Sequence, residues 1–291
     1  MNSKINVIIF LFAVVLFSSC QKETEPRPMP DSRYPTIYKP LTSVEWETRN
    51  TAFQKINEYS RLSLNEYGFV DGEIPLNERD SLTKNFVIQK LEFILGKYQS
   101  FLGISDTISV DYRNDIRIPV PIFAMMPGNS YSIDYYFEVM EDFKKEDYWS
   151  EIKGQFDIQT YLLTQNTIGN ENFIGPTVYI IFNAEENKIT ISGNWFPIVF
   201  IPQQEIYFKD DALPVAYQFL LKETGKDFWE QKQTFDAQKT FIRITKGTNI
   251  EIHECWYYRV AIPEESYYYY IFIDTQTGEL IHSYKRGMYY L

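Results

Sequence analysis

Hydrophobic and polar residues alternate in runs of strand length along the last third of the chain. Two runs rich in Tyr, Ile, Val and Phe, at 255–262 and 267–274, are separated by the polar break 263–266. A third run, 279–281, follows the turn residues 275–278. Aromatic and β-branched residues favour the half-buried surface of a sheet, so this pattern predicts an antiparallel meander.

The turn between the second and third runs has residues that meet the backbone requirements of a tight turn. We expect Asp274 to accept hydrogen bonds from backbone amides and Gly278 to supply a positive φ. The segment 274–279 lacks the repeated carboxylates of an EF-hand calcium loop. Asp274 and Gly278 are therefore predicted to be structural residues.

A helix is predicted ahead of these strands, over 209–224. Asp210 or Asp211 can cap its beginning, and Gly225 follows its end. Another strand is predicted over 240–245. A helix followed by an antiparallel sheet is an α+β arrangement.

The preceding part of the chain shows the same two patterns. Thr42 and Glu45 have the spacing of a capping box, which predicts a helix beginning there. A second helix is predicted from an Asp80 or Ser81 cap to Gly103. Strands are predicted over 108–112, 116–124, 131–137, 155–163, 177–182 and 188–192, and a short helix over 138–149. A boundary near Ile201 gives two α+β units, 41–201 and 202–291.

The first 20 residues have the pattern of an export signal. Lys4 precedes an apolar run, 7–17, whose 11 residues are too few to span a bilayer. Phe17-Ser18-Ser19-Cys20 resembles a bacterial lipobox, with Phe17 where Leu is usual. The pattern predicts removal of residues 1–19, lipidation of Cys20 and a place in the cell envelope, on the outer membrane and facing the periplasm or the surface. An ordinary secretory signal and an uncleaved anchor stay open as alternatives.

Residues 20–40 are rich in proline and charge and poor in apolar side chains. Such a segment buries too little surface to offset its ordering entropy, so we predict an extended tether after the anchor. Lys22-Glu23 is similar to the surface-export signals of Bacteroidetes lipoproteins.

Composition narrows the classes of partner. The 291 residues carry a formal net charge of −11, which argues against nucleic-acid binding and against unspecific attraction to anionic lipid. Aromatic residues make up 17% of the chain, which favours β-rich packing or a surface that makes contacts through Tyr and Trp.

Residues able to carry catalysis are scarce. The two histidines, His253 and His282, could join Cys255 in a zinc site, but strand-end histidines beside a turn are the simpler interpretation. Cys255 alternates with Trp256 along a strand, which favours a buried cysteine over a reactive thiol. No Gly-x-Ser-x-Gly, phosphate-binding glycine loop or nucleotide fingerprint is present. The sequence predicts no enzyme, no cofactor and no metal site.

The tyrosines offer candidate contact residues. Alternation places two rings of Tyr267, Tyr268, Tyr269 and Tyr270 on each face of the strand. One pair would join the core, and the other would either bind a partner or sugar or lie beneath a loop. Tyr289 and Tyr290 in the tail are further candidates, with a terminal strand or loose end as the alternative.

Two known propeptide families resemble these units. The stretch 187–193, with Gln159-Thr160-Tyr161, resembles the end of the FTP (fungalysin/thermolysin propeptide) module. Ala212 to Gly225, Phe241 to Ile244, Trp256 to Val260 and Tyr270 to Ile281 resemble the helix and strands of a PepSY domain. The resemblance implies two cystatin-like modules, each with a helix packed on an antiparallel sheet.

The same resemblance implies a non-catalytic function. Tandem FTP and PepSY modules inhibit and chaperone a secreted metalloprotease attached to them. Here the sequence ends at Leu291 without such a domain, so we expect a secreted or surface protease to be bound in trans. A lipoprotein that binds glycan or peptide through exposed aromatics, and a purely structural envelope protein, remain as alternatives.

Overall fold

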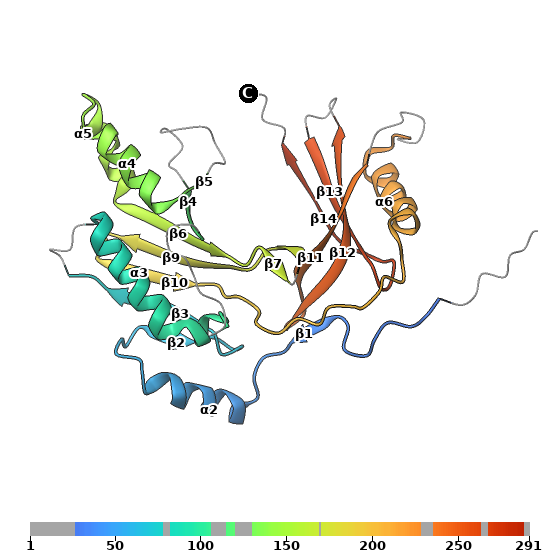
Figure 1. Cartoon of the computed structure of the whole chain (residues 1–291), viewed down its shortest axis with the longest axis horizontal. Helices are drawn as coiled ribbons and strands as arrows, with labels where there is room; N and C mark the ends of the chain where they lie inside the picture. The colour runs from blue at the N-terminus through green and yellow to red at the C-terminus, as the bar shows by residue number, and fades with distance from the viewer. Residues whose placement is uncertain are drawn as a thin grey trace, which may run out of the picture.

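The computed structural model describes residues 27–77, 82–105, 115–119, 130–168, 170–227, 235–262 and 267–287. Two β-sheets stand beside each other, the first with several helices and the second with one described helix beside it (Figure 1). The predicted α+β class is confirmed. The expected strand at 108–112, the caps at Asp80 and Ser81, and all residues before Arg27 lie outside the described ranges.

The first sheet has seven strands in the order β2-β3-β10-β9-β6-β4-β5. Their bounds are β2 (Leu62–Leu64), β3 (Val70–Pro75), β4 (Ile116–Pro119), β5 (Ser130–Tyr131), β6 (Ile158–Thr164), β9 (Thr177–Asn183) and β10 (Lys188–Ser192). Hydrophobic residues alternate along β6, β9 and β10, so one face of the sheet is buried.

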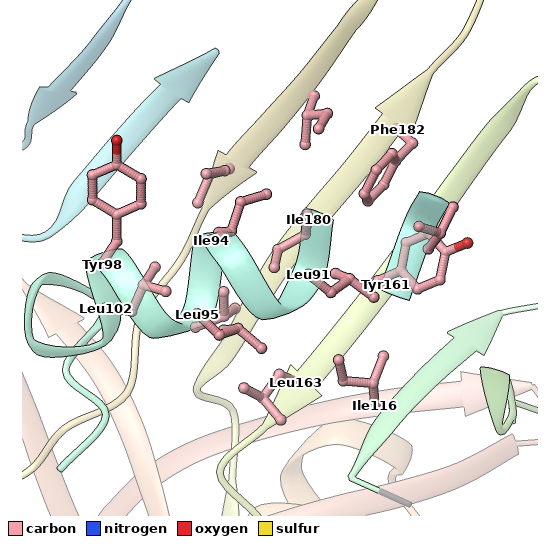
Figure 2. Close-up of a cluster of buried hydrophobic side chains, with 14 of the residues drawn as sticks. Leu91, Ile94, Leu95, Tyr98, Leu102, Ile116, Tyr161, Leu163, Ile180 and Phe182 are labelled. Atoms are coloured by element: carbon pink, nitrogen blue, oxygen red, sulfur yellow. The ribbon is translucent and has the colours of Figure 1, made fainter. Parts of the chain in front are cut away.

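Helix α3 (Lys84–Tyr98) covers that face. Its buried stripe packs over the inward side chains of β6 and β9 (Figure 2). The stripe consists of Val87, Leu91, Ile94, Leu95 and Tyr98. The Thr83 hydroxyl caps the helix by accepting from the Phe86 amide, and a 3₁₀ turn (Gln99–Leu102) ends at Gly103 in the left-handed conformation. Helix α2 (Ser43–Gln54) begins with the capping box predicted at Thr42 and Glu45.

One predicted strand is wrong. Residues 131–137, which look β-like because they are aromatic, belong mostly to helix α4 (Ile133–Phe143). The Ser132 hydroxyl accepts from the Tyr135 amide and caps this helix. Ile133, Tyr136, Phe137 and Met140 recur at helical spacing and are buried. The short helices α5 (Trp149–Ile152) and η2 (Lys153–Phe156) follow.

The second sheet contains the predicted meander. Its order is β14-β13-β12-β11-β8-β7, and β1 also pairs with β12. The bounds are β1 (Thr36–Tyr38), β7 (Thr167–Ile168), β8 (Glu171–Ile174), β11 (Asp236–Lys246), β12 (Asn249–Ile262), β13 (Tyr267–Asp274) and β14 (Leu280–Gly287). Adjacent strands among β11 to β14 are antiparallel, whereas β8 is parallel to β11.

Helix α6 (Lys209–Thr224) packs on one face of the second sheet. Ala212, Ala216 and Leu220 are fully buried against the strands. The Asp211 carboxylate accepts from the Phe208 amide at the helix start, and Gly225 closes the end with φ +68°. The predicted bounds and the closing glycine are confirmed, but the N-cap residue is Phe208, and Asp211 supports it from the third helical position.

The second sheet takes strands from outside 202–291, which sequence alone did not predict. The β7-β8 hairpin lies inside the expected first unit, yet β8 pairs with Thr240 to Ile242 of β11. Residues 36–38 pair with Ile250 to Ile252 of β12. The extended tether predicted for 20–40 therefore does not describe residues 27–38, which dock on the second sheet. The proline and charge content of this segment predicts that it cannot form a core of its own, but it does not predict that residues 36–38 pair with a distant strand.

Candidate binding surface

The two faces of β12, β13 and β14 are covered differently. On one face, Tyr258, Val260, Tyr269 and Ile271 form a buried cluster with α6. Side chains of the alternate residues project from the other face. We call Tyr257, Tyr268, Tyr270, Phe272, His282 and Tyr284 the aromatic face. Within the described ranges, α6 lies on the opposite side and no helix joins the cluster around Phe272 (Figure 1).

The rings of the aromatic face are stacked across the strands. Tyr270 and Tyr284 have ring centroids 4.7 Å apart and planes 15° apart, and Tyr257 and Phe272 have centroids 5.1 Å apart. Two coplanar rings side by side could not bring their centres this close, so the rings of each pair are stacked, one over part of the other. Tyr257 and Tyr270 are half-buried in these stacks, and Phe272 is fully buried. Tyr284, on the outermost strand, is 40% exposed.

The four consecutive tyrosines divide between the two faces as alternation predicts. Tyr269 is buried against α6, while Tyr267 lies on the same face near the sheet's end and is exposed. Tyr268 and Tyr270 belong to the aromatic face and are half-buried. Tyr289 and Tyr290 lie outside the described residues.

Cationic side chains border these tyrosines although the chain is strongly acidic. The Arg259 guanidinium lies 5.6 Å from the centre of the Tyr268 ring, and the Lys285 ammonium lies 5.1 Å from that of Tyr267. Arg286 is opposite Tyr268 in the pairing of β13 with β14. Burial, reinforced by the neighbouring Tyr284 and Tyr270, raises the pKa of Tyr257 to about 12. The hydroxyl of Tyr257 is thus a hydrogen-bond donor at neutral pH.

A buried polar network lies where the N-terminal segment meets β12 and β13. The fully buried Asp274 carboxylate accepts from the Tyr34 hydroxyl at 2.7 Å and lies 2.7 Å from His253 Nδ1. Its other oxygen accepts from the Gln276 and Thr277 amides, at 2.7 and 2.9 Å. Gly278 follows with φ +72°. The turn roles predicted for Asp274 and Gly278 agree with this geometry, but Asp274 also binds two side chains that the sequence did not assign to it.

His253 bridges two carboxylates. Its Nε2 lies 3.0 Å from Glu251 Oε2, opposite the contact with Asp274. A neutral imidazole has one N–H group, so it can donate to one of these carboxylates, whereas the protonated ring can donate to both. The ring of Tyr34 meets that of His253 edge-on, with centroids 5.9 Å apart. This arrangement joins residues 27–38 to the strands that carry the aromatic face.

Neighbouring charges form a second cluster around Lys239. Its ammonium lies 3.3 to 3.5 Å from carboxylate oxygens of Glu171, Glu205 and Glu254. Burial raises the pKa of Glu254 despite hydrogen bonds from Thr275 and Lys239. Burial lowers the pKa of Lys239, but the carboxylates of Glu254 and Glu171 raise it by more, and the net change is upward. Because Glu171 is on β8, this cluster connects the two units.

The candidate zinc residues are not brought together. Cys255 is fully buried, and burial raises its thiol pKa well above the usual range. His253 binds Glu251 of its own strand and Asp274 of β13, while His282 is on β14, level with Phe272 of β13. Within the described ranges, no three His, Cys, Asp or Glu side chains are placed to hold a metal ion.

Two of the pockets lie beside charged side chains that could contact a small ligand. One, of about 730 Å³, lies between α4, the start of α3 and η2, where Phe137, Trp149 and Phe156 alternate with lysines and carboxylates. The other, of about 460 Å³, lies beside Tyr34, Glu251, His253 and Leu280. Neither pocket has a convergent set of groups that defines a reaction.

Sequence reasoning missed Tyr34, Glu251 and Glu254 as members of the network. A usable signal was present, because Glu251, His253 and Glu254 interrupt a strand that is otherwise apolar and aromatic. Polar residues in a buried strand are usually hydrogen-bonded to one another. The partner Tyr34, 220 residues away from Glu254, had no such signal.

Comparisons with known proteins give little further information. No protein-family model matches the chain. No curated protein matches it. Among solved structures, the Bacillus megaterium YpeB C-terminal domain is similar over 85% of this chain and 98% of that chain, with 9% identity and a TM-score of 0.31. A TM-score this low makes the similarity weak, and it carries no information about function.

Across the described ranges, none of the helices has both the length and the apolar character required to cross a bilayer.

Proposed function

We propose that the protein is a non-catalytic lipoprotein of the cell envelope that binds a secreted or surface protease in trans, as an inhibitor or folding assistant. The anchor would be the lipid on Cys20. The contact surface would be the aromatic face. The resemblance to FTP and PepSY modules belongs to this proposal and gives the class of partner.

The observation that carries the proposal is the aromatic face itself. Half-buried and exposed tyrosines lie, together with the fully buried Phe272, on a sheet face that α6 leaves open, beside Arg259 and Arg286. Tyrosine and arginine are enriched where proteins bind one another, because they combine apolar area with hydrogen-bonding groups. Tyr257 and Tyr284 add hydroxyl groups whose pKa values are raised by burial, so they donate hydrogen bonds at neutral pH.

The ring geometry favours a protein partner over a sugar. An aromatic platform for sugar requires an exposed ring face, whereas Tyr257, Tyr270 and Phe272 are stacked against their neighbours. Glycan binding remains a second candidate because the outermost ring, Tyr284, is 40% exposed. A single platform of this kind would bind sugar weakly.

Capture of the partner from envelope extract tests the proposal. The full chain, extracted in mild detergent, would be immobilised and the retained proteins tested for protease activity with and without added chain. We expect recovery of a protease and inhibition, or faster refolding, by the wild-type chain. A Tyr270→Ala, Tyr284→Ala double variant should lose at least tenfold in affinity, since central interface tyrosines each contribute about 1–2 kcal/mol.

A tyrosine of equal exposure elsewhere supplies the control. Tyr179 is on β9 of the first sheet and is 41% exposed, so Tyr179→Ala removes a comparable ring away from the aromatic face. Its capture of the protease should match that of the wild type. Recovery of no protease, or equal loss with Tyr179→Ala, contradicts the proposal. Binding to a glycan array that disappears with Tyr284→Ala would favour the second candidate.

A further inference from the structure

Strand β14 (Leu280–Gly287) forms an open edge of the second sheet. It pairs with β13 over Tyr267 to Ile273, and no other described strand pairs with it. Along the outer side of such a strand, alternate backbone N–H and C=O groups point away from the sheet. An eight-residue edge is long enough to bind an added strand.

The same sheet already takes strands from outside the meander at two other places. Residues 36–38 pair with β12 beside β13, and residues 171–174 pair with β11 at its far side. Each addition spans three residue pairs and comes from a segment distant in sequence. Adding a strand is thus one way in which this sheet contacts other parts of the chain. The edge of β14 is the remaining place at the meander's end.

The charges of β14 select the kind of strand that fits. Lys285 and Arg286 are adjacent and exposed, so one projects on each face of the sheet, and Arg259 lies two strands inward. Opposite charges on directly opposed residues stabilise a strand pair, and like charges destabilise it. A second copy of β14 would bring more lysine and arginine to the same edge. An added strand with carboxylates opposite Lys285 and Arg286 avoids that repulsion.

We propose that β14 binds an extended, acidic segment of a partner protein as an added β-strand. Its carboxylates pair with Lys285 and Arg286, and an apolar or aromatic side chain lies beside the exposed ring of Tyr284. The inference rests on the proposed function only in taking the partner to be a protein. It names the part of the partner that makes the contact.

Synthetic peptides test this directly on the full chain. The probe is a fluorescent, end-blocked octapeptide of Val and Tyr with two adjacent Glu residues at its centre, so that one carboxylate projects on each face of the added strand. One control replaces each Glu with Lys, and another carries N-methyl groups on alternate amides and cannot pair along its backbone. We expect the acidic peptide to bind with a Kd of about 1 mM or lower. The Kd of each control peptide should be at least roughly tenfold higher. Hydrogen exchange should slow across 280–287 and stay unchanged across 167–174.

Charge reversal separates pairing from general attraction. A Lys285→Glu, Arg286→Glu variant should lose the acidic peptide and bind the lysine peptide instead. A Lys144→Glu, Lys145→Glu variant makes the same change in net charge at the exposed end of α4, and it should bind as the wild type does. Equal binding of the N-methylated peptide, no protection of 280–287, or no binding at all overturns the inference.

The outcome is independent of the protease assay. Peptide binding without recovery of a protease would overturn the proposed function and leave strand addition standing. Recovery of a protease that is unaffected by reversal of Lys285 and Arg286, together with failure of the peptide, would overturn strand addition alone.

Discussion

Replacement of Asp274 tests the importance of the buried network most directly. Its side chain accepts four hydrogen bonds in the wild type if His253 Nδ1 carries a proton: from Tyr34, His253 and the amides of Gln276 and Thr277. Asp274→Ala leaves all four donors without this acceptor. Three of the bonds are buried, but Tyr34 keeps the Glu254 carbonyl as an acceptor, so two buried donors are left unpaired, at about 1–3 kcal/mol each. We expect a loss of about 2–6 kcal/mol, a large part of the 5–15 kcal/mol that stabilises a typical domain.

Asp274→Asn separates shape from charge. The amide oxygen can still accept from the Gln276 and Thr277 amides, and the NH₂ group can donate to His253 if Nδ1 is unprotonated. Tyr34 can still donate to the Glu254 carbonyl, which lies 3.2 Å from its hydroxyl. We therefore expect a smaller loss, of about 1–2 kcal/mol.

Guanidinium unfolding, followed by hydrogen exchange at 250–262 and 267–287, measures the effect in the second sheet apart from the first. Exchange at 36–38 should rise with the Ala variant, because Tyr34 loses its 2.7 Å bond to Asp274 and keeps only the 3.2 Å contact with the Glu254 carbonyl. Glu279→Ala, at an exposed position of the same turn, serves as the control and should change stability by less than about 0.5 kcal/mol. Equal losses for Ala and Asn, or a loss below about 1 kcal/mol for Ala, would refute the account of Asp274.

Three further outcomes follow from the geometry. Gly278→Ala should lower the free energy of unfolding by about 2 kcal/mol or more, because φ is +72° and the new Cβ would lie 2.4 Å from the Tyr207 ring. Gly225→Ala is the control: its φ is +68°, but the space around it is open, and the loss should be about 1 kcal/mol. Similar losses for the two variants in thermal or chemical unfolding would contradict this. Cys255 should resist thiol reagents at both pH 7 and pH 9 until the chain unfolds, because burial raises its pKa, and residue-specific mass spectrometry would detect early labelling as the contrary result. Lys239→Gln should destabilise the chain by about 1–3 kcal/mol at pH 7. Because the pKa of Glu254 is raised in the folded chain, this carboxyl becomes protonated, and loses its charge, at a higher pH than in the unfolded chain. The loss of stability caused by Lys239→Gln should therefore shrink as the pH falls towards 4.5. A loss that is the same at every pH would show that repulsion among Glu171, Glu205 and Glu254 is unimportant.

Local signals predicted much of the secondary structure. The capping residues of α2 and the glycine after α6 act within a few residues of the helix end, so sequence alone identifies them. The meander was equally clear, because its strands follow one another and pair with their neighbours. Residues 131–137 misled because aromatic side chains suit strands, while the cap at Ser132 and the spacing of Tyr136 and Met140 decide for a helix.

Distant pairings were not predictable from one sequence. Nothing in Thr36 to Tyr38 or in Glu171 to Ile174 indicates which strand they join, because a backbone edge accepts any extended segment of suitable length. The candidate tyrosines 267–270 were assigned correctly to two faces by alternation alone. The ring stacking that makes a surface of them required Tyr257 and Tyr284, which neighbouring strands bring to the same face.

The docking of the first described residues on β12 has a consequence for how the chain acquires its structure. Chains are made from the N-terminus, but Thr36 pairs with Ile252 and Tyr34 bonds to Asp274, so these partners exist only after most of the protein has been synthesised. Contacts this far apart in sequence form late because a long loop must close first. We therefore expect residues 27–38 to dock only after β12 and β13 have been made. Synthesis of β12 and β13 thus determines when residues 27–38 can become protected.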